Sequence, residues 1–105
     1  MSLPVRFSPE AAAELRDAAG WYEERHAGLG STFLAAVDSV VARLTVWPGT
    51  GSPVEGLGAH LDVRRAPLGR FPYHLAYLVT DDAVQVLAVA HDRRRPRYWS
   101  GRTES

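Results

Sequence analysis

The chain has 105 residues, of which 46% are hydrophobic, with twelve basic residues (all arginine), twelve acidic residues and no cysteine. This length predicts one domain spanning residues 1–105, and the absence of cysteine excludes disulfides, a cysteine nucleophile and thiolate metal sites. The neutral net charge hides an asymmetry: residues 1–58 hold four arginines against seven acids, and residues 59–105 hold eight against five. From His91 to Arg102 there are five arginines against one acid, Asp92, and this segment is expected to meet an anionic partner.

The N-terminal half predicts a short strand followed by two helices. Residues 3–7 are a strand candidate, and Ser8-Pro9-Glu10 then starts a helix, because serine caps, proline suits the first position and glutamate complements the positive helix end. This helix ends near Gly28. The second helix has the clearest period in the chain, with one apolar stripe made of Phe33, Val37, Val40, Leu44 and Trp47. The short connection predicts an antiparallel helical hairpin.

The C-terminal half predicts three strands after a glycine-rich loop at residues 49–58. Side chains alternate between the two faces of a strand at residues 61–66 and again at residues 71–80, and Asp81-Asp82 predicts a turn. Residues 84–90 form the almost continuous apolar run that is typical of a central strand covered on both faces. The order β-α-α-β-β-β predicts an α+β fold, with the hairpin packed on one face of a small, mainly antiparallel sheet.

No membrane or secretory segment is expected. The run at residues 83–90 is far shorter than the ~20 apolar residues of a spanning helix, and the N-terminus lacks the apolar core and cleavage site of a signal peptide. We therefore expect a cytoplasmic protein.

Several polar and aromatic residues have a functional and a structural interpretation. His91, at the end of the last strand, is either a general acid or base or a partner of the backbone. His74 lies on the face opposite Tyr73, which we expect to be less buried, and is either functional or a solvated strand residue. The cluster at 93–95 either binds an anion or is a solvated segment paired with Asp62 or Asp92.

The aromatic residues have similar alternatives. Tyr98 and Trp99 either stack on a base or cover the core, whereas Trp21, Tyr22 and Trp47 are interpreted as packing residues. Glu23 and Glu24 are interpreted as a solvated helix face. No histidine pair has the spacing of a metal site, so no metal is expected.

Five segments in order resemble one family of toxins. They are "FSPEAAAEL" at 7–15, "WYEE" at 21–24, "GLGSTF" at 28–33, "RFPYHLAY" at 70–77 and "AVAHDRRRPRYW" at 88–99. Over about residues 5 to 102, the chain resembles the RelE/ParE superfamily of type II toxin–antitoxin systems. The fourth and fifth segments are more similar to the ParE branch, associated with plasmid stabilisation.

The resemblance implies a bacterial toxin that arrests growth and is neutralised by a cognate antitoxin in a hetero-oligomer, without a cofactor. In the ParE branch the target is DNA gyrase. In the RelE branch the toxin is a metal-independent endoribonuclease that cleaves messenger RNA on the ribosome. A third alternative is a member that has lost its toxicity but still binds its antitoxin.

The two branches assign different roles to the same residues. For a ribonuclease, the candidates for proton transfer are His91, Tyr98 and His74. The candidates for binding a target or its phosphates are Arg64, Arg65, Arg70, Arg93, Arg94, Arg95 and Trp99. In "YHLAY" a histidine stands where ribonuclease members usually have arginine, and the chain has no lysine. These departures favour the gyrase-binding alternative.

Overall fold

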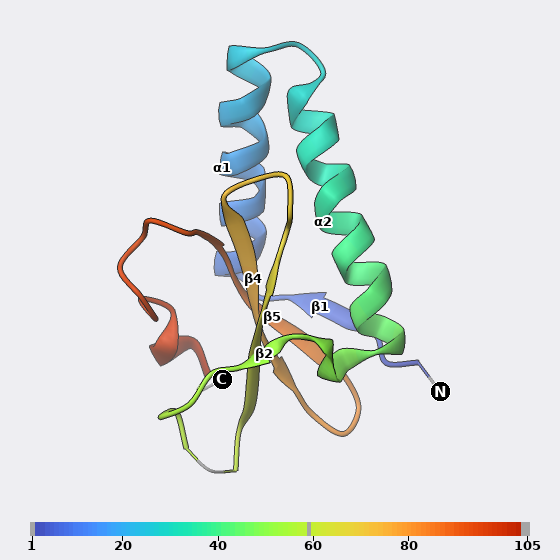
Figure 1. The fold of residues 1–105 in the computed structure, drawn as a ribbon, viewed down its shortest axis with the longest axis vertical. Helices are drawn as coiled ribbons and strands as arrows, with labels where there is room; N and C mark the ends of the chain where they lie inside the picture. The colour runs from blue at the N-terminus through green and yellow to red at the C-terminus, as the bar shows by residue number, and fades with distance from the viewer. Residues whose placement is uncertain (1, 59, 104–105) are drawn as a thin grey trace.

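The computed structural model describes residues 2–58 and 60–103, and its elements follow the predicted order. Figure 1 shows a hairpin of two helices above a twisted sheet. The elements are β1 (Val5–Phe7), α1 (Pro9–Arg25), α2 (Leu29–Val46), a 3-10 turn (Pro48–Thr50), β2 (Ser52–Pro53), β3 (Asp62–Pro67), β4 (Tyr73–Val79), β5 (Val84–His91) and a second 3-10 turn (Ser100–Thr103). The two-residue strand β2 lies in a segment predicted to be loop, because two residues are too few to show a period.

Both helices begin as local chemistry dictates, although the second uses an acceptor from outside its own sequence. The Ser8 hydroxyl accepts from the Ala11 amide at 3.1 Å, and Pro9 occupies the first turn of α1, as predicted. At α2 the N-cap residue is Gly28, which has no side chain to accept a hydrogen bond. Instead the Glu23 carboxylate accepts from the amides of Gly28 at 2.9 Å and Gly30 at 3.0 Å. Glu23 and Glu24 are exposed, as predicted, and Glu23 in addition caps α2.

The sheet has the order β1-β5-β4-β3-β2, with β1 parallel to β5 and the other pairs antiparallel. Strand β5 thus lies between β1 and β4, which confirms the prediction of a central strand. The last three strands, β3, β4 and β5, form an antiparallel meander, in agreement with the predicted, mainly antiparallel sheet. The observed α+β architecture is the predicted one.

The helical hairpin buries its apolar stripe on one face of this sheet. Phe33, Val37, Val40 and Leu44 are buried against side chains of β4 and β5 that include Leu75, Tyr77, Val84, Val86 and Val89. Tyr22 also packs here, with its ring 5.3 Å from that of Phe33.

Two tryptophans predicted to pack in the core are exposed. Trp47 is 64% exposed because α2 ends at Val46 and the turn at Pro48 redirects the chain. Trp21 is 49% exposed, with the Arg25 guanidinium 3.5 Å above its ring. The packing interpretation was therefore wrong for both, and correct for Tyr22.

Helix α2 is long and apolar enough to cross a membrane by length and composition alone, with a mean hydropathy of 1.4 over 18 residues. The core helix of a globular protein meets the same criterion. Here the apolar stripe of α2 is packed on the sheet, and 28% of the same 18-residue window is buried.

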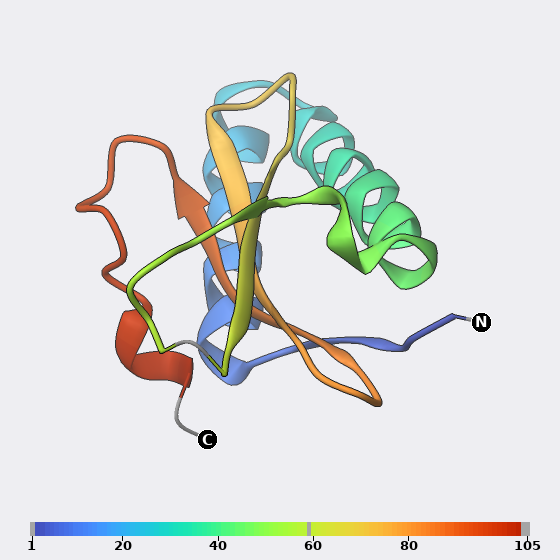
Figure 2. The same cartoon turned by 60° about the horizontal axis from the view of Figure 1, so that its bottom comes forward.

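The opposite face of the sheet is covered by the C-terminal segment. Tyr77 pairs with Val86 and Ala76 with Ala88, so Leu87 is the extra residue of a bulge. The bulge shifts the alternation of β5, and Leu87, Ala88 and Ala90 join a second buried cluster that contains Trp99, which is 3% exposed. Figure 2 shows the red C-terminal segment returning along this side of the sheet to end beside the start of α1.

Candidate functional site

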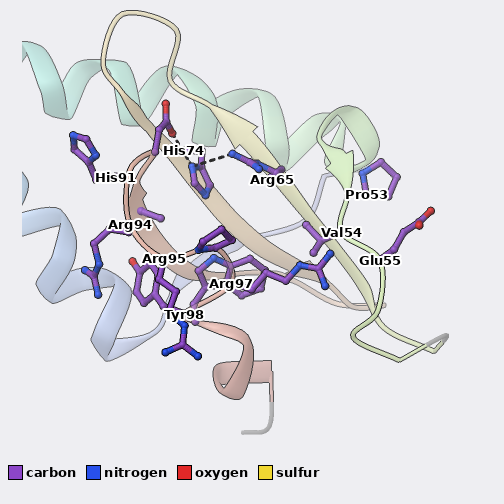
Figure 3. Close-up of a pocket in the computed structure, with 14 residues that line it drawn as sticks. Pro53, Val54, Glu55, Arg65, His74, His91, Arg94, Arg95, Arg97 and Tyr98 are labelled. Carbon is purple, nitrogen blue, oxygen red and sulfur yellow. Dashed lines mark hydrogen bonds and ion pairs between the residues drawn. The ribbon is translucent and has the colours of Figure 1, made fainter.

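A groove of about 450 Å³ lies between the C-terminal segment and the face of the sheet that the helices leave free. Its walls come from the loop after β2, from single residues of β3 and β4, and from the end of β5 with the segment that follows (Figure 3). The lining residues are Pro53, Val54, Glu55, Arg65, His74, Ala90, His91, Asp92, Arg94, Arg95, Pro96, Arg97, Tyr98 and Trp99. With four arginines against two carboxylates, the groove favours an anionic ligand.

His74 lies at the centre of this groove and is 9% exposed. Its Nδ1 is 2.9 Å from Oδ1 of Asp92 and 3.4 Å from Nη2 of Arg65, which Figure 3 shows pointing at the ring. Because a carboxylate only accepts hydrogen bonds, the contact with Asp92 places a proton on Nδ1 of His74. In the neutral ring Nε2 is then the nitrogen that can accept a hydrogen bond or a proton. His74 is on the predicted face, but that face is more buried than expected, because the C-terminal segment covers it.

His91 ends β5, as predicted, and its ring is held by the neighbouring chain. Nδ1 accepts from the amide of Arg93 at 3.0 Å. The ring packs edge-on against Tyr73, with 5.0 Å between the centroids. These contacts correspond to the backbone-bonding interpretation of His91, and they place the proton of the neutral ring on Nε2.

Tyr98 is held by a carboxylate that sequence reasoning did not single out. Its hydroxyl donates to Oε2 of Glu14 at 2.7 Å. Burial, together with the hydrogen bond and charge of Glu14, raises the pKa of Tyr98 to about 12. Arg94 stacks on the ring at 3.9 Å. The hydroxyl therefore keeps its proton at neutral pH and is engaged in a tertiary contact.

The candidate arginines divide into two groups. Arg65, Arg94 and Arg95 line the groove together with His74, His91, Tyr98 and Trp99. Arg64, Arg70 and Arg93 do not line it.

Arg64 has a structural contact of its own. It donates to Asp62 at 2.8 Å and to the carbonyls of Gly49 at 3.0 Å and Gly51 at 2.9 Å, so it fastens the turn after α2 to β3. Trp99 lines the groove but is buried in the second core cluster, as its core interpretation predicts.

Sequence reasoning did not single out as functional two residues that line the groove, Asp92 and Arg97, or two that anchor the segment beside it, Glu14 and Arg102. Among the described residues other than glycine, Arg97 alone has a positive φ, 59°. Its Nη1 lies so close to Gly56 that a Cβ there would be 3.1 Å away. Asp92 and Arg97 stand within the basic segment that the sequence highlights. Glu14 and Arg102 are 88 residues apart, so no local pattern connects them.

The comparisons with known proteins agree with this architecture. The family model described as ParE toxin of type II toxin–antitoxin system, parDE, matches residues 5–96. A solved structure from P. aeruginosa, described as a chromosomal ParDE toxin–antitoxin system, superposes with a TM-score of 0.61 and 23% sequence identity, covering 86% of this chain and 96% of that chain. At this identity the similarity concerns the fold. No curated protein matches the chain.

The family match spans β1, the helical hairpin, the meander and most of the basic segment that lines the groove. These are the elements on which the sequence resemblance was based. The chain therefore belongs to the ParE toxin family of type II toxin–antitoxin systems.

Proposed function

We propose that this protein is the toxin of a type II pair, that it arrests growth in the cytoplasm by binding DNA gyrase, and that a cognate antitoxin neutralises it in a hetero-oligomer. The observation that favours binding over catalysis is the state of Tyr98. Its hydroxyl donates to Glu14 and its pKa is raised to about 12, so it does not serve as a ready proton donor to a leaving group.

The surface we assign to the target is the basic rim of the groove. Arg94 and Arg95 are exposed and line the groove, and Arg93 is exposed beside them. Binding energy at protein interfaces is concentrated in a few anchors, among which arginine and aromatic residues are enriched. We therefore assign the dominant contacts to Arg93, Arg94 and Arg95.

One specific observation favours the ribonuclease alternative. Asp92 orients His74, and a guanidinium of Arg65 lies 3.4 Å from the same ring nitrogen. An oriented imidazole next to a cation could move a proton while the arginine stabilises a crowded phosphate. This alternative requires that removal of His74 or His91 lower the cleavage rate by about 10²–10⁴.

Substitution of the three arginines tests the proposal. The triple variant Arg93→Ala, Arg94→Ala, Arg95→Ala is expected to lower affinity for purified gyrase by roughly tenfold or more and to relieve growth arrest. His74→Ala and His91→Ala are expected to remain toxic. The readouts are growth after induction, plasmid supercoiling and messenger RNA integrity over time.

A matched control is the triple variant Arg6→Ala, Arg16→Ala, Arg43→Ala, which removes the same charge from exposed positions outside the groove. It should arrest growth as the parent does. Cleavage of messenger RNA before any change in supercoiling, lost in His74→Ala or His91→Ala, would overturn the gyrase proposal and establish the ribonuclease alternative.

A further inference from the structure

The carboxylate of Glu14 joins three parts of the chain that are distant in sequence. On α1, its side chain is only 17% exposed. Its oxygens accept from the Val89 amide of β5 at 3.1 Å, from the Tyr98 hydroxyl at 2.7 Å, and from Nη1 and Nη2 of Arg102 at 3.0 and 3.3 Å. One carboxylate therefore has four donors around it, from a strand and from the C-terminal segment.

These contacts occur along the part of β5 that β1 does not pair with. β1 pairs with β5 only at Val84 to Val86, so the outer edge of β5 beyond the pairing needs other partners. Glu14 accepts from the Val89 amide, and Arg102 donates to the carbonyl of Leu87 at 3.0 Å. Glu14 and Arg102 thus satisfy this edge and attach the C-terminal segment to it.

The segment between β5 and these anchors contains residues 93–97, here called the arginine segment. Its start is fixed by the Asp92 amide, which donates to the carbonyl of Pro72 at 2.8 Å. Its last residue, Arg97, has a left-handed φ of 59° and is followed directly by the anchored Tyr98. A non-glycine residue keeps such a conformation only where its surroundings impose it.

We propose that Glu14 is a positioning residue, which holds the arginine segment over the groove by fastening Tyr98 and Arg102 to α1 and β5. That the segment binds the toxin's target rests on the proposed function. The fastening itself does not.

A charged acceptor is required for this role. Hydrogen bonds that involve a charged group are stronger than those between neutral groups, and the two Nη groups of a guanidinium can donate to both oxygens of one carboxylate. Burial by itself lowers the pKa of Arg102, but the hydrogen bond and charge of Glu14, together with the charges of Tyr98 and Glu10, outweigh it, and the net shift is upward. The raised pKa of Tyr98 has Glu14 among its causes. Glu14→Gln keeps the shape but removes the charge.

Amide hydrogen exchange on the purified protein tests the fastening. In Glu14→Gln we expect exchange at residues 93–99 and at Val89 to rise by about tenfold or more, the factor that corresponds to loss of a charge-assisted hydrogen bond. The core of β4 should stay protected. Glu24→Gln is the matched control, because Glu24 is an exposed glutamate of the same helix, and it should leave exchange unchanged.

Ultraviolet titration of the tyrosines gives a readout that a merely structural role would not move. Tyr98→Phe identifies the ionisation of Tyr98 by its absence. In Glu14→Gln the pKa of Tyr98 should fall from about 12. The negative charge of Glu14, which raises this pKa, is lost, while the positive charges of Arg94 and Arg102 still lower it. If Glu14→Gln does not fold, Arg102→Gln serves instead and should loosen the same segment.

The outcomes separate the two proposals. Unchanged exchange at residues 93–99 in both Glu14→Gln and Arg102→Gln overturns the positioning role. A loosened segment with weakened growth arrest supports both proposals. A loosened segment with undiminished arrest supports the positioning role and overturns the assignment of the arginine segment to the target.

Discussion

The hydroxyl of Tyr77 links the sheet to the turn that follows α2. Tyr77 is fully buried in β4, donates to the carbonyl of Pro48 at 2.8 Å and accepts from the amide of Gly51 at 2.9 Å. Burial raises its pKa. Since the same turn leads into β2 and the loop that forms one wall of the groove, this hydroxyl helps to place that wall.

Tyr77→Phe should therefore destabilise the fold by about 1–3 kcal/mol, because it leaves the buried Gly51 amide without its acceptor. Urea unfolding measures the change. Tyr22→Phe is the control: its ring packs in the same core, but its hydroxyl has no bonding partner within residues 2–58 and 60–103. Equal stability of the two variants would contradict the role assigned to the Tyr77 hydroxyl.

At the residue scale, the sequence predicts where candidate groups stand along the chain but not what they touch. His74 was placed on the correct face, and its burial could not be foreseen because Asp92 and the covering segment lie 18 or more residues further on. Glu14 looked like one more helical glutamate. Its role depends on Tyr98 and Arg102, at separations of 84 and 88 residues. Such contacts follow from tertiary packing, not from local spacing.

At the scale of elements, periodicity and capping predicted α1, α2 and the strands of the meander. The stripe of α2 is correct for four of its five residues, because these repeat at helical spacing and face the sheet. The prediction is wrong for Trp47, because α2 ends one residue earlier, at Val46. The bulge at Leu87 was also hidden, because an unbroken apolar run does not show on which face each residue lies.

Leu44→Ala should cost about 2–5 kcal/mol of stability, because it removes a fully buried side chain from the stripe and leaves a cavity. Val46→Ala, two residues on in the same helix, removes a side chain that is exposed and should change stability little. Thermal unfolding of both variants gives the comparison. A melt unchanged by Leu44→Ala would mean that the stripe is wrongly assigned.

At the scale of the whole molecule, the fold concentrates the charge asymmetry of the sequence in one groove. Four of the eight arginines in residues 59–105 line it: Arg65, Arg94, Arg95 and Arg97. The sequence predicts that the segment from His91 to Arg102 meets an anionic partner. It does not predict that β3 and the segment after β5 come together, since that requires the sheet.

We predict that a short reading frame next to this one encodes an acidic antitoxin, and that co-expression yields a stable complex and relieves toxicity. Because charges near the surface are screened within ~10 Å at 0.1 M salt, the affinity should fall as salt is raised. The arginine triple variant should show a weaker dependence than the Arg6, Arg16, Arg43 control. Failure of the neighbouring product to bind in a pull-down would count against a toxin–antitoxin pair.

The parallel pairing of β1 with β5 has a consequence for synthesis. Val5 pairs with Val84, so the first strand to leave the ribosome finds its partner only after most of the chain has been translated. Contacts between such distant residues form late, because a long loop must first close. β4 also borders β5, and the Glu14 anchor needs Arg102. Until β5 and residues 93–102 have been translated, the chain therefore lacks the strand that pairs with β1 and β4, and it lacks the anchored arginine segment to which we assign the target.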